Sequence, residues 1–240
     1  GAHEARRAFF REAGATATDH GHASAYTAWL EPDGIEALYA KVAAGVTSAA
    51  EAELFRGHML TEMARMSIED GMVMQLHPGV YRNHNPALLA AFGRDKGADI
   101  PLPGEFVRAL KPLLDRHGND PRLTLILFTL DEDVYSRELA PLAGHYPALR
   151  LGPPWGFHDS PEGMRGVRER ATETAGFYNT VGFNDDTRAF FSIPARHDVA
   201  RRIDSAFLAR LVAEHRLDEA EAHEIAHALA YDLVKQAYRL

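Results

Sequence analysis

Strand-like and helix-like segments alternate along most of the chain, and this alternation limits the possible folds more than any other feature of the sequence. Short apolar or β-branched runs typical of buried strands occur at residues 14–19, 71–77, 123–130, 148–152 and 179–184. Helical spacing is found between them, at residues 48–70, 105–117, 136–144 and 161–176. Strands separated by helices form parallel βαβ units, so we expect an α/β fold with one parallel sheet or barrel.

The C-terminal residues 198–240 break this alternation. Two helices are expected there, at 198–215 and 218–238, and they should form a hairpin that packs on the sheet. We therefore treat residues 1–240 as one domain. A closed eight-stranded barrel typically takes about 250 residues, so five βα units are too few for one. The sheet is then either open and doubly wound, or part of a barrel that lacks three N-terminal strands. Because the chain begins with Gly1 and not with Met, we expect it to be a fragment.

The composition excludes several classes of partner and cofactor. The 240 residues include 34 Asp and Glu against 26 Lys and Arg, and the basic residues form no long run, so we expect no nucleic-acid partner. The lack of cysteine excludes disulfides, thiolate metal sites and thiol nucleophiles. No apolar run approaches the roughly 20 residues that span a bilayer, and the first residues lack a signal-peptide cleavage pattern. We expect a cytoplasmic protein without a membrane partner.

Polar side chains stand where the expected strands end, which is where active sites of parallel α/β folds are built. Asp19-His20-Gly21-His22 follows the first strand, His77 and Arg82 follow the second, Trp155 follows the fourth, and Asp185, Asp186 and Arg188 follow the fifth. His77 could bind a divalent metal or a substrate oxygen, and Asp186 could be a metal ligand or a proton acceptor. The guanidinium groups of Arg82 and Arg188 could hold a carboxylate in bidentate fashion, which suits a small acidic substrate.

Each of these assignments has a structural alternative. His77 could be a hydrogen-bonded core histidine, and either Asp185 or Asp186 could cap a helix. The two arginines could form surface ion pairs.

Other histidines carry weaker signals. His20 and His22 have the His-x-His spacing of a metal motif, but so short a pattern is common. His223 and His227 share a helix face without an HExxH motif, so we expect them to face solvent. The chain has no P-loop, GxGxxG or GxSxG pattern, which argues against ATP, dinucleotide and serine-hydrolase chemistry.

Three segments taken together resemble the uronate (glucuronate) isomerase family of the amidohydrolase superfamily. The first is MQLHPGVYRNHN at residues 74–85, and the second is the turn at residues 151–155 with Phe157 and Asp159. The third begins with Asp-Thr-Arg at residues 186–188 and continues through Phe190, Ser192, Pro194, Arg196-His197 and Arg201-Arg202. The resemblance extends over nearly the whole chain, from the Asp-His-Gly segment at residues 19–21 to Asp232.

The resemblance implies a distorted (β/α)8 barrel of the TIM type, of which this chain would supply strands four to eight. By the family pattern, His77 and Asp186 would be metal-site residues, and Arg82, Trp155 and Arg188 would line the sugar pocket, with Asp186 and Arg188 catalytic. The cofactor would be a divalent metal, with Zn²⁺ expected. The family's first-strand His-x-His pair has no counterpart here, so the metal site is incomplete in this chain. We also expect a homo-oligomer.

The implied reaction is an aldose–ketose isomerisation, of D-glucuronate to D-fructuronate and of D-galacturonate to D-tagaturonate. Two alternatives remain open. One is a metal-dependent hydrolase of the same superfamily, although the strand that ends at residues 129–131 lacks the extra histidine. The other is an inactive truncated product with only an assembly role. Without three strands, we expect Val73, Leu125, Leu127 and Leu149 to be exposed and the isolated chain to aggregate.

Overall fold

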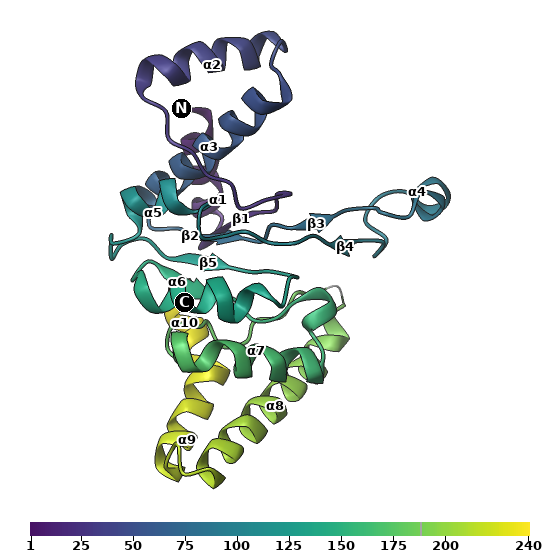
Figure 1. Ribbon diagram of the computed structural model, residues 1–240, viewed down its shortest axis with the longest axis vertical. Coiled ribbons are helices and arrows are strands. Elements are labelled where there is room, and N and C mark those ends of the chain that lie inside the picture. The colour runs from purple at the N-terminus through teal and green to yellow at the C-terminus, as the bar shows by residue number, and fades with distance from the viewer. Residues whose placement is uncertain (188) are drawn as a thin grey trace.

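The computed structural model describes residues 1–187 and 189–240, and its core is a parallel sheet flanked by helices (Figure 1). The sheet has the strand order β1-β2-β5-β6, with bounds β1 (Ala17–His20), β2 (Val73–Leu76), β5 (Leu125–Leu127) and β6 (Leu149–Leu151). All three pairings are parallel, as the alternating sequence predicts. Because the spatial order follows the chain order, successive βα units stack side by side, and the carboxyl ends of the strands share one end of the sheet.

Helices lie at both ends of the molecule's longest axis, with α2 at one end and α9 at the other (Figure 1). Their bounds are α1 (Ala2–Glu12), α2 (Pro32–Ala44), α3 (Ala49–Asp70), α4 (Pro86–Phe92), α5 (Lys111–His117), α6 (Ala140–His145), α7 (Pro161–Ala175), α8 (Ile193–Ala213), α9 (Glu219–His227) and α10 (Leu233–Tyr238). Short turns of 3-10 or π type complete the chain: η1 (Tyr135–Leu139), η2 (Gly156–His158), η3 (Phe190–Ser192) and η4 (Ala228–Asp232). No helix in residues 1–187 and 189–240 is long and apolar enough to cross a membrane.

The expected fifth strand is present only as a single parallel bridge between Leu151 and Thr180. Val181 N–H donates to the Leu151 carbonyl over 2.9 Å, and the chain then turns at Gly182, where φ is +72°. A β-carbon at Gly182 would lie 2.2 Å from the Leu229 carbonyl oxygen. The C-terminal η4 turn therefore packs directly on this backbone, and the close approach is what shortens the strand.

The two faces of the sheet have different partners. Side chains alternate along each strand, so Leu125, Leu127 and Leu149 point to the face covered by α3, α5, α6 and α7. Val73 lies on the opposite face with Ala237 of α10. All four are at most 1 % exposed, so the expectation that they are solvent-exposed is wrong. The helices α3, α5, α6 and α7 cover one face of the sheet, and α10 packs on apolar residues of the other face.

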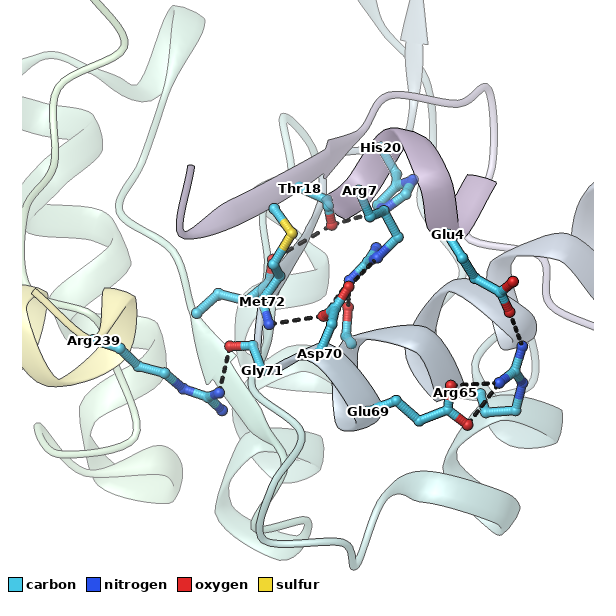
Figure 2. Close-up of polar contacts among 12 residues, drawn as sticks. Glu4, Arg7, Thr18, His20, Arg65, Glu69, Asp70, Gly71, Met72 and Arg239 are labelled. Carbon is cyan, nitrogen blue, oxygen red and sulfur yellow. Dashed lines mark hydrogen bonds and ion pairs between the residues drawn. The ribbon is translucent and has the colours of Figure 1, made fainter. Parts of the chain in front are cut away.

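Both ends of the chain are fastened near the amino end of β2 (Figure 2). Arg7 of α1 donates to both oxygens of Asp70, over 2.5 and 2.9 Å, and to Ser67 Oγ over 2.9 Å. Asp70 also accepts from Met72 N–H, so it joins the end of α3 to the start of the strand. From the other end of the chain, Arg239 donates to the carbonyl of Gly71. The first helix and the residue that ends the last helix are thus both bound to the chain just before β2.

Helix bounds agree with the sequence where capping residues are clear. Ser48 and Glu51 form a capping box at the start of α3, and Gly71 ends that helix at φ +78°. The helix expected at 105–117 is shorter, because Glu105 and Glu138 accept the backbone N–H groups of residues 106–109 and hold them in turns. The helix α5 begins only at Lys111.

An arm that the periodicity does not predict projects from the body (Figure 1). It consists of the antiparallel pair β3 (Val80–Tyr81) and β4 (Ile100–Pro101) with α4 at its tip. Asn85 caps α4 by accepting from the N–H groups of residues 87 and 88, and none of the seven residues of α4 is buried. The arm follows directly after the carboxyl end of β2 and carries Arg82 to the site described next.

Candidate active site

The carboxyl ends of the strands open into a cavity of about 350 Å³. Its lining residues come from the carboxyl halves of β1 and β2, from the segment between β2 and β4, and from the segments after β5, β6 and the Thr180 bridge: Asp19, Gln75, His77, Arg82, Asp95, Phe128, Trp155, Asn184, Asp185 and Asp186. The structure therefore brings His77, Arg82, Trp155 and Asp186 together on one cavity. Arg188 lies outside the described residues.

The imidazole of His77 is held on three sides. Its Nδ1 lies 2.7 Å from Asp19 Oδ1, and the ring meets the Trp155 indole edge to face, with centroids 5.5 Å apart. A β-carbon at Gly21 would lie 2.6 Å from Nε2. Any residue other than glycine at position 21 would therefore displace the imidazole ring. Nδ1 of His77 is paired with Asp19, as the alternative of a hydrogen-bonded histidine predicts. His77 nevertheless lines the cavity, which is the position expected of a site residue.

Asp19 is a functional candidate by its position at a strand end, but the sequence alone assigns it no role. It stands in the Asp-His-Gly-His segment at the end of the first strand, where the spacing of the two histidines drew attention instead. Its position near the carboxyl end of β1 was the available signal.

His20 and His22 do not line the cavity. Their rings stack with centroids 6.5 Å apart, and His20 Nε2 lies 3.1 Å from Thr18 Oγ1. Burial, reinforced by the neighbouring His22, lowers the pKa of His20 to about 4. Burial likewise lowers the pKa of His22. The pair belongs to the packing around β1. His223 and His227 have side chains that are 81 % and 69 % exposed, as expected.

Asp185 and Asp186 differ in environment. The Asp185 side chain is almost fully buried and accepts a hydrogen bond from the Thr187 hydroxyl over 2.6 Å, whereas Asp186 is exposed at the cavity. Neither caps a helix, because the N-cap residues of η3 and α8 are Ala189 and Ser192. The helix-cap alternative is therefore wrong.

Arg82 and Trp155 present polar hydrogens at the cavity. Arg82 donates to Asp99 Oδ2 over 3.2 Å, yet its side chain is 48 % exposed and lines the cavity. The Trp155 Nε1 donor and the Asn184 Oδ1 acceptor are buried without a hydrogen-bond partner in the described part of the chain. Buried polar atoms are nearly always paired. Both atoms belong to residues that line the cavity, so the cavity lining holds one buried donor and one buried acceptor that the described residues do not pair.

The end of β5 is occupied by loop contacts. Thr129 Oγ1 accepts from Asp131 N–H, and Asp131 Oδ2 accepts from Gly104 N–H over 2.7 Å. His158 of η2 approaches this end from outside, with Nε2 2.8 Å from the Leu130 carbonyl oxygen. These groups hold the loops in place, and they leave no extra histidine directed at the cavity from β5.

The residues that the structure describes do not supply a full set of metal ligands. Zn²⁺ sites in proteins use three or four nitrogen and oxygen ligands at about 2 Å. Within residues 1–187 and 189–240, no three or more His, Asp or Glu side chains are grouped so that they could hold one. His77 and Asp186 offer one nitrogen and one carboxylate, and the described residues alone do not complete the site.

A parallel sheet with helices packed outside it and a polar cavity at the strand carboxyl ends defines part of a TIM-like (β/α) barrel enzyme. The chain belongs to the glucuronate isomerase family, whose model matches residues 1–238.

Relatives and solved structures agree. The chain is 70% identical to the uronate isomerase of Xanthomonas campestris pv. campestris (strain B100) and 69% identical to that of Phenylobacterium zucineum, over all of this chain and 51% and 50% of those proteins. The crystal structure of glucuronate isomerase from Caulobacter crescentus superposes with a TM-score of 0.97 at 67% identity, covering 99% of this chain and 50% of that one. A uronate isomerase structure from Thermotoga maritima gives 0.88 at 26% identity, covering 95% and 51%. The chain thus spans about half the length of these relatives.

Proposed function

We propose that this chain is the C-terminal part of a cytoplasmic uronate isomerase that serves bacterial hexuronate breakdown. Its substrates would be D-glucuronate, converted to D-fructuronate, and D-galacturonate, converted to D-tagaturonate. The observation that carries the proposal is the convergence of His77, Arg82, Trp155 and Asp186 on one cavity in a chain of the glucuronate isomerase family.

The chemistry of the cavity is consistent with this reaction. Moving a proton from C2 to C1 through an enediolate requires a proton acceptor, a route for the hydroxyl proton and positive charge near the enediolate oxygens. Asp186 supplies a carboxylate that can accept and return a proton, and Arg188 supplies the charge. Arg82, which lines the cavity, would bind the carboxylate at C6. Trp155 lines the cavity and would pack its indole against the sugar.

A divalent metal, with Zn²⁺ as our candidate, would supply Lewis acidity to the substrate oxygens when bound. His77 and Asp186 are the residues of this chain that we assign to it. Because the described residues do not complete the ligand set, the other ligands would come from the half of the protein that lies outside this chain.

A chimera tests the proposal directly. This chain would replace the matching half of the Caulobacter crescentus protein, and ketose formation would be measured with D-glucuronate and D-galacturonate. We expect turnover on at least one uronate within about tenfold of the parent, whereas the 240-residue chain with added Zn²⁺ should form no ketose. A folded, Zn²⁺-loaded chimera that forms no ketose but hydrolyses a lactone or ester would favour the hydrolase alternative. Light scattering on the same sample tests the expected homo-oligomer.

Arg188→Lys in the chimera tests the role of that residue. A guanidinium holds two oxygens at once and an ammonium does not, so kcat should fall by about 100-fold or more. Near-parental kinetics on both uronates would make Arg188 a structural residue.

A further inference from the structure

Arg196 joins two loops at the mouth of the cavity. It lies in the first turn of α8, and its Nη1 donates to the Asp186 carbonyl over 2.7 Å and lies 2.7 Å from Asp185 Oδ1. Its Nη2 is paired with Asp159 Oδ2. Asp159 ends the η2 turn that begins at Trp155, so one guanidinium links the loop after β6 to the loop after the Thr180 bridge.

The charges at this junction are nearly buried. The side chains of Asp159 and Asp185 are 7 % and 4 % exposed, and that of Arg196 is 26 % exposed. Two carboxylates in so little solvent repel each other unless a cation lies between them. The planar fork of arginine can serve both carboxylates and a carbonyl, which the single ammonium of lysine cannot do in the same geometry.

The Trp155 loop depends on this junction through its own hydrogen bonds. His158 N–H donates to the Trp155 carbonyl over 3.1 Å, and Asp159 N–H donates to that of Gly156 over 3.3 Å. A displacement of Asp159 would therefore be transmitted through one short turn to the indole. On the other side, a displaced Asp186 carbonyl would move the carboxylate of the same residue. Arg196 itself is not among the residues that line the cavity.

We propose that Arg196 is a positioning residue, which sets the distance between the Trp155 and Asp186 walls of the cavity without touching the substrate. The inference rests on the proposed isomerase function for its kinetic consequence, while its structural consequence is independent of any activity.

The kinetic test uses Arg196→Lys in the chimera. Displacement of reacting groups by about 1 Å can cost about 100-fold in rate. We expect kcat to fall by about 10- to 100-fold and the pH profile of kcat/KM to shift, while the melting temperature changes little. The matched control is Arg210→Lys on the same helix, where the guanidinium pairs with Glu169 and Glu214 and lies over the Phe207 ring at a half-exposed site. The control should keep the parental kinetics.

The structural test is hydrogen–deuterium exchange. In Arg196→Lys, peptides from residues 153–160 and 184–187 should exchange faster than in the parent, and peptides from β2 and β5 should not. If the unsubstituted chimera formed no ketose, the proposed function would fail, and exchange would still decide the role of Arg196. Unchanged exchange in both loops would overturn the inference, as would faster exchange with parental kcat and pH profile in an active chimera.

Asp159→Asn changes the other partner of the ion pair with Arg196. This variant tests the positioning role if Arg196→Lys does not fold. It should lower kcat by less than Arg196→Lys and speed exchange in the same loops. Where both variants fold, the double variant should be no slower than Arg196→Lys alone, because both changes break one junction. Independent, additive losses, or no faster exchange in Asp159→Asn, would refute a shared positioning role.

Discussion

Asp19 Oδ1 lies 2.7 Å from Nδ1 of His77, which couples the ends of two neighbouring strands. The parallel register of β1 and β2 creates this contact, because His77 N–H donates to the His20 carbonyl and so places the two side chains at adjacent positions. A carboxylate on one ring nitrogen fixes the orientation and tautomer of a histidine. The remaining nitrogen of His77, Nε2, is then the one that can act on a ligand.

Asp19→Asn tests this relationship in the chimera. The amide keeps the shape of the side chain but loses its charge, so the ring of His77 is held less firmly. Loss of such a supporting carboxylate typically costs about 10- to 100-fold, and we expect that decrease in kcat/KM. The melting temperature should stay close to the parental value because the Asp19 side chain is half exposed. Asp115→Asn, at a carboxylate as exposed as that of Asp19, is the control, and parental kinetics for Asp19→Asn would contradict the assignment.

Gly21→Ala tests the other side of the same ring. The added methyl would lie 2.6 Å from His77 Nε2, and the imidazole must move to avoid it. We expect kcat/KM to fall by more than tenfold, with a crystal structure showing the ring displaced from Asp19. At Gly34 the nearest atom to an added methyl is 3.9 Å away, so Gly34→Ala should behave as the parent. An active Gly21→Ala variant with an unmoved ring would show that the contact is not restrictive.

Arg7→Ala addresses the stability of the fold. Arg7 and Asp70 form a nearly buried ion pair with side chains 8 % and 17 % exposed, and removing one partner leaves a charge without compensation. Breaking such a pair costs about 3–5 kcal/mol, to be measured by urea unfolding of the chimera. Arg165→Ala, whose partner Glu162 is 82 % exposed, should cost about 0–1 kcal/mol. Equal losses in the two variants would mean that burial of the Arg7 pair adds nothing.

The sequence predicted those parts of the fold that local signals determine. Apolar runs such as residues 123–130 predicted the strands, and the helical spacing of apolar residues at 48–70 predicted the main helix, because burial patterns repeat over a few residues. The arm around α4 was missed because none of the seven residues of α4 is buried, and a helix without a buried face leaves no amphipathic period to detect. The strand expected at 179–184 was overestimated, because the approach of the Leu229 backbone at Gly182 is a tertiary effect.

The sequence predicted those residues of the candidate site that are identified by their position after a strand. His77, Arg82, Trp155 and Asp186 follow strand ends, and parallel strands bring such residues together whatever lies between them. The sequence assigned no site role to Asp19 or Arg196, because each residue acts through its contact with another residue. One orients a ring across a strand pair, and the other joins two loops, and neither relation leaves a spacing pattern in the sequence.

The pH dependence of stability should report on His20. Burial lowers its pKa from 6.5 to about 4 in the folded state, so below pH 6.5 the unfolded chain binds a proton that the folded chain does not. The contribution of His20 is therefore fully present above about pH 6.5 and is lost as the pH falls to about 4, and it amounts to about 3 kcal/mol over that window. His20→Gln removes this titration, so urea unfolding of the chimera at pH 7.0, 5.5 and 4.5 should show a shallower decline than the parent. His223→Gln, at a fully hydrated position, should leave the decline unchanged. If His20→Gln and the parent lost stability equally over this range, His20 would titrate in the folded state as it does in the unfolded one.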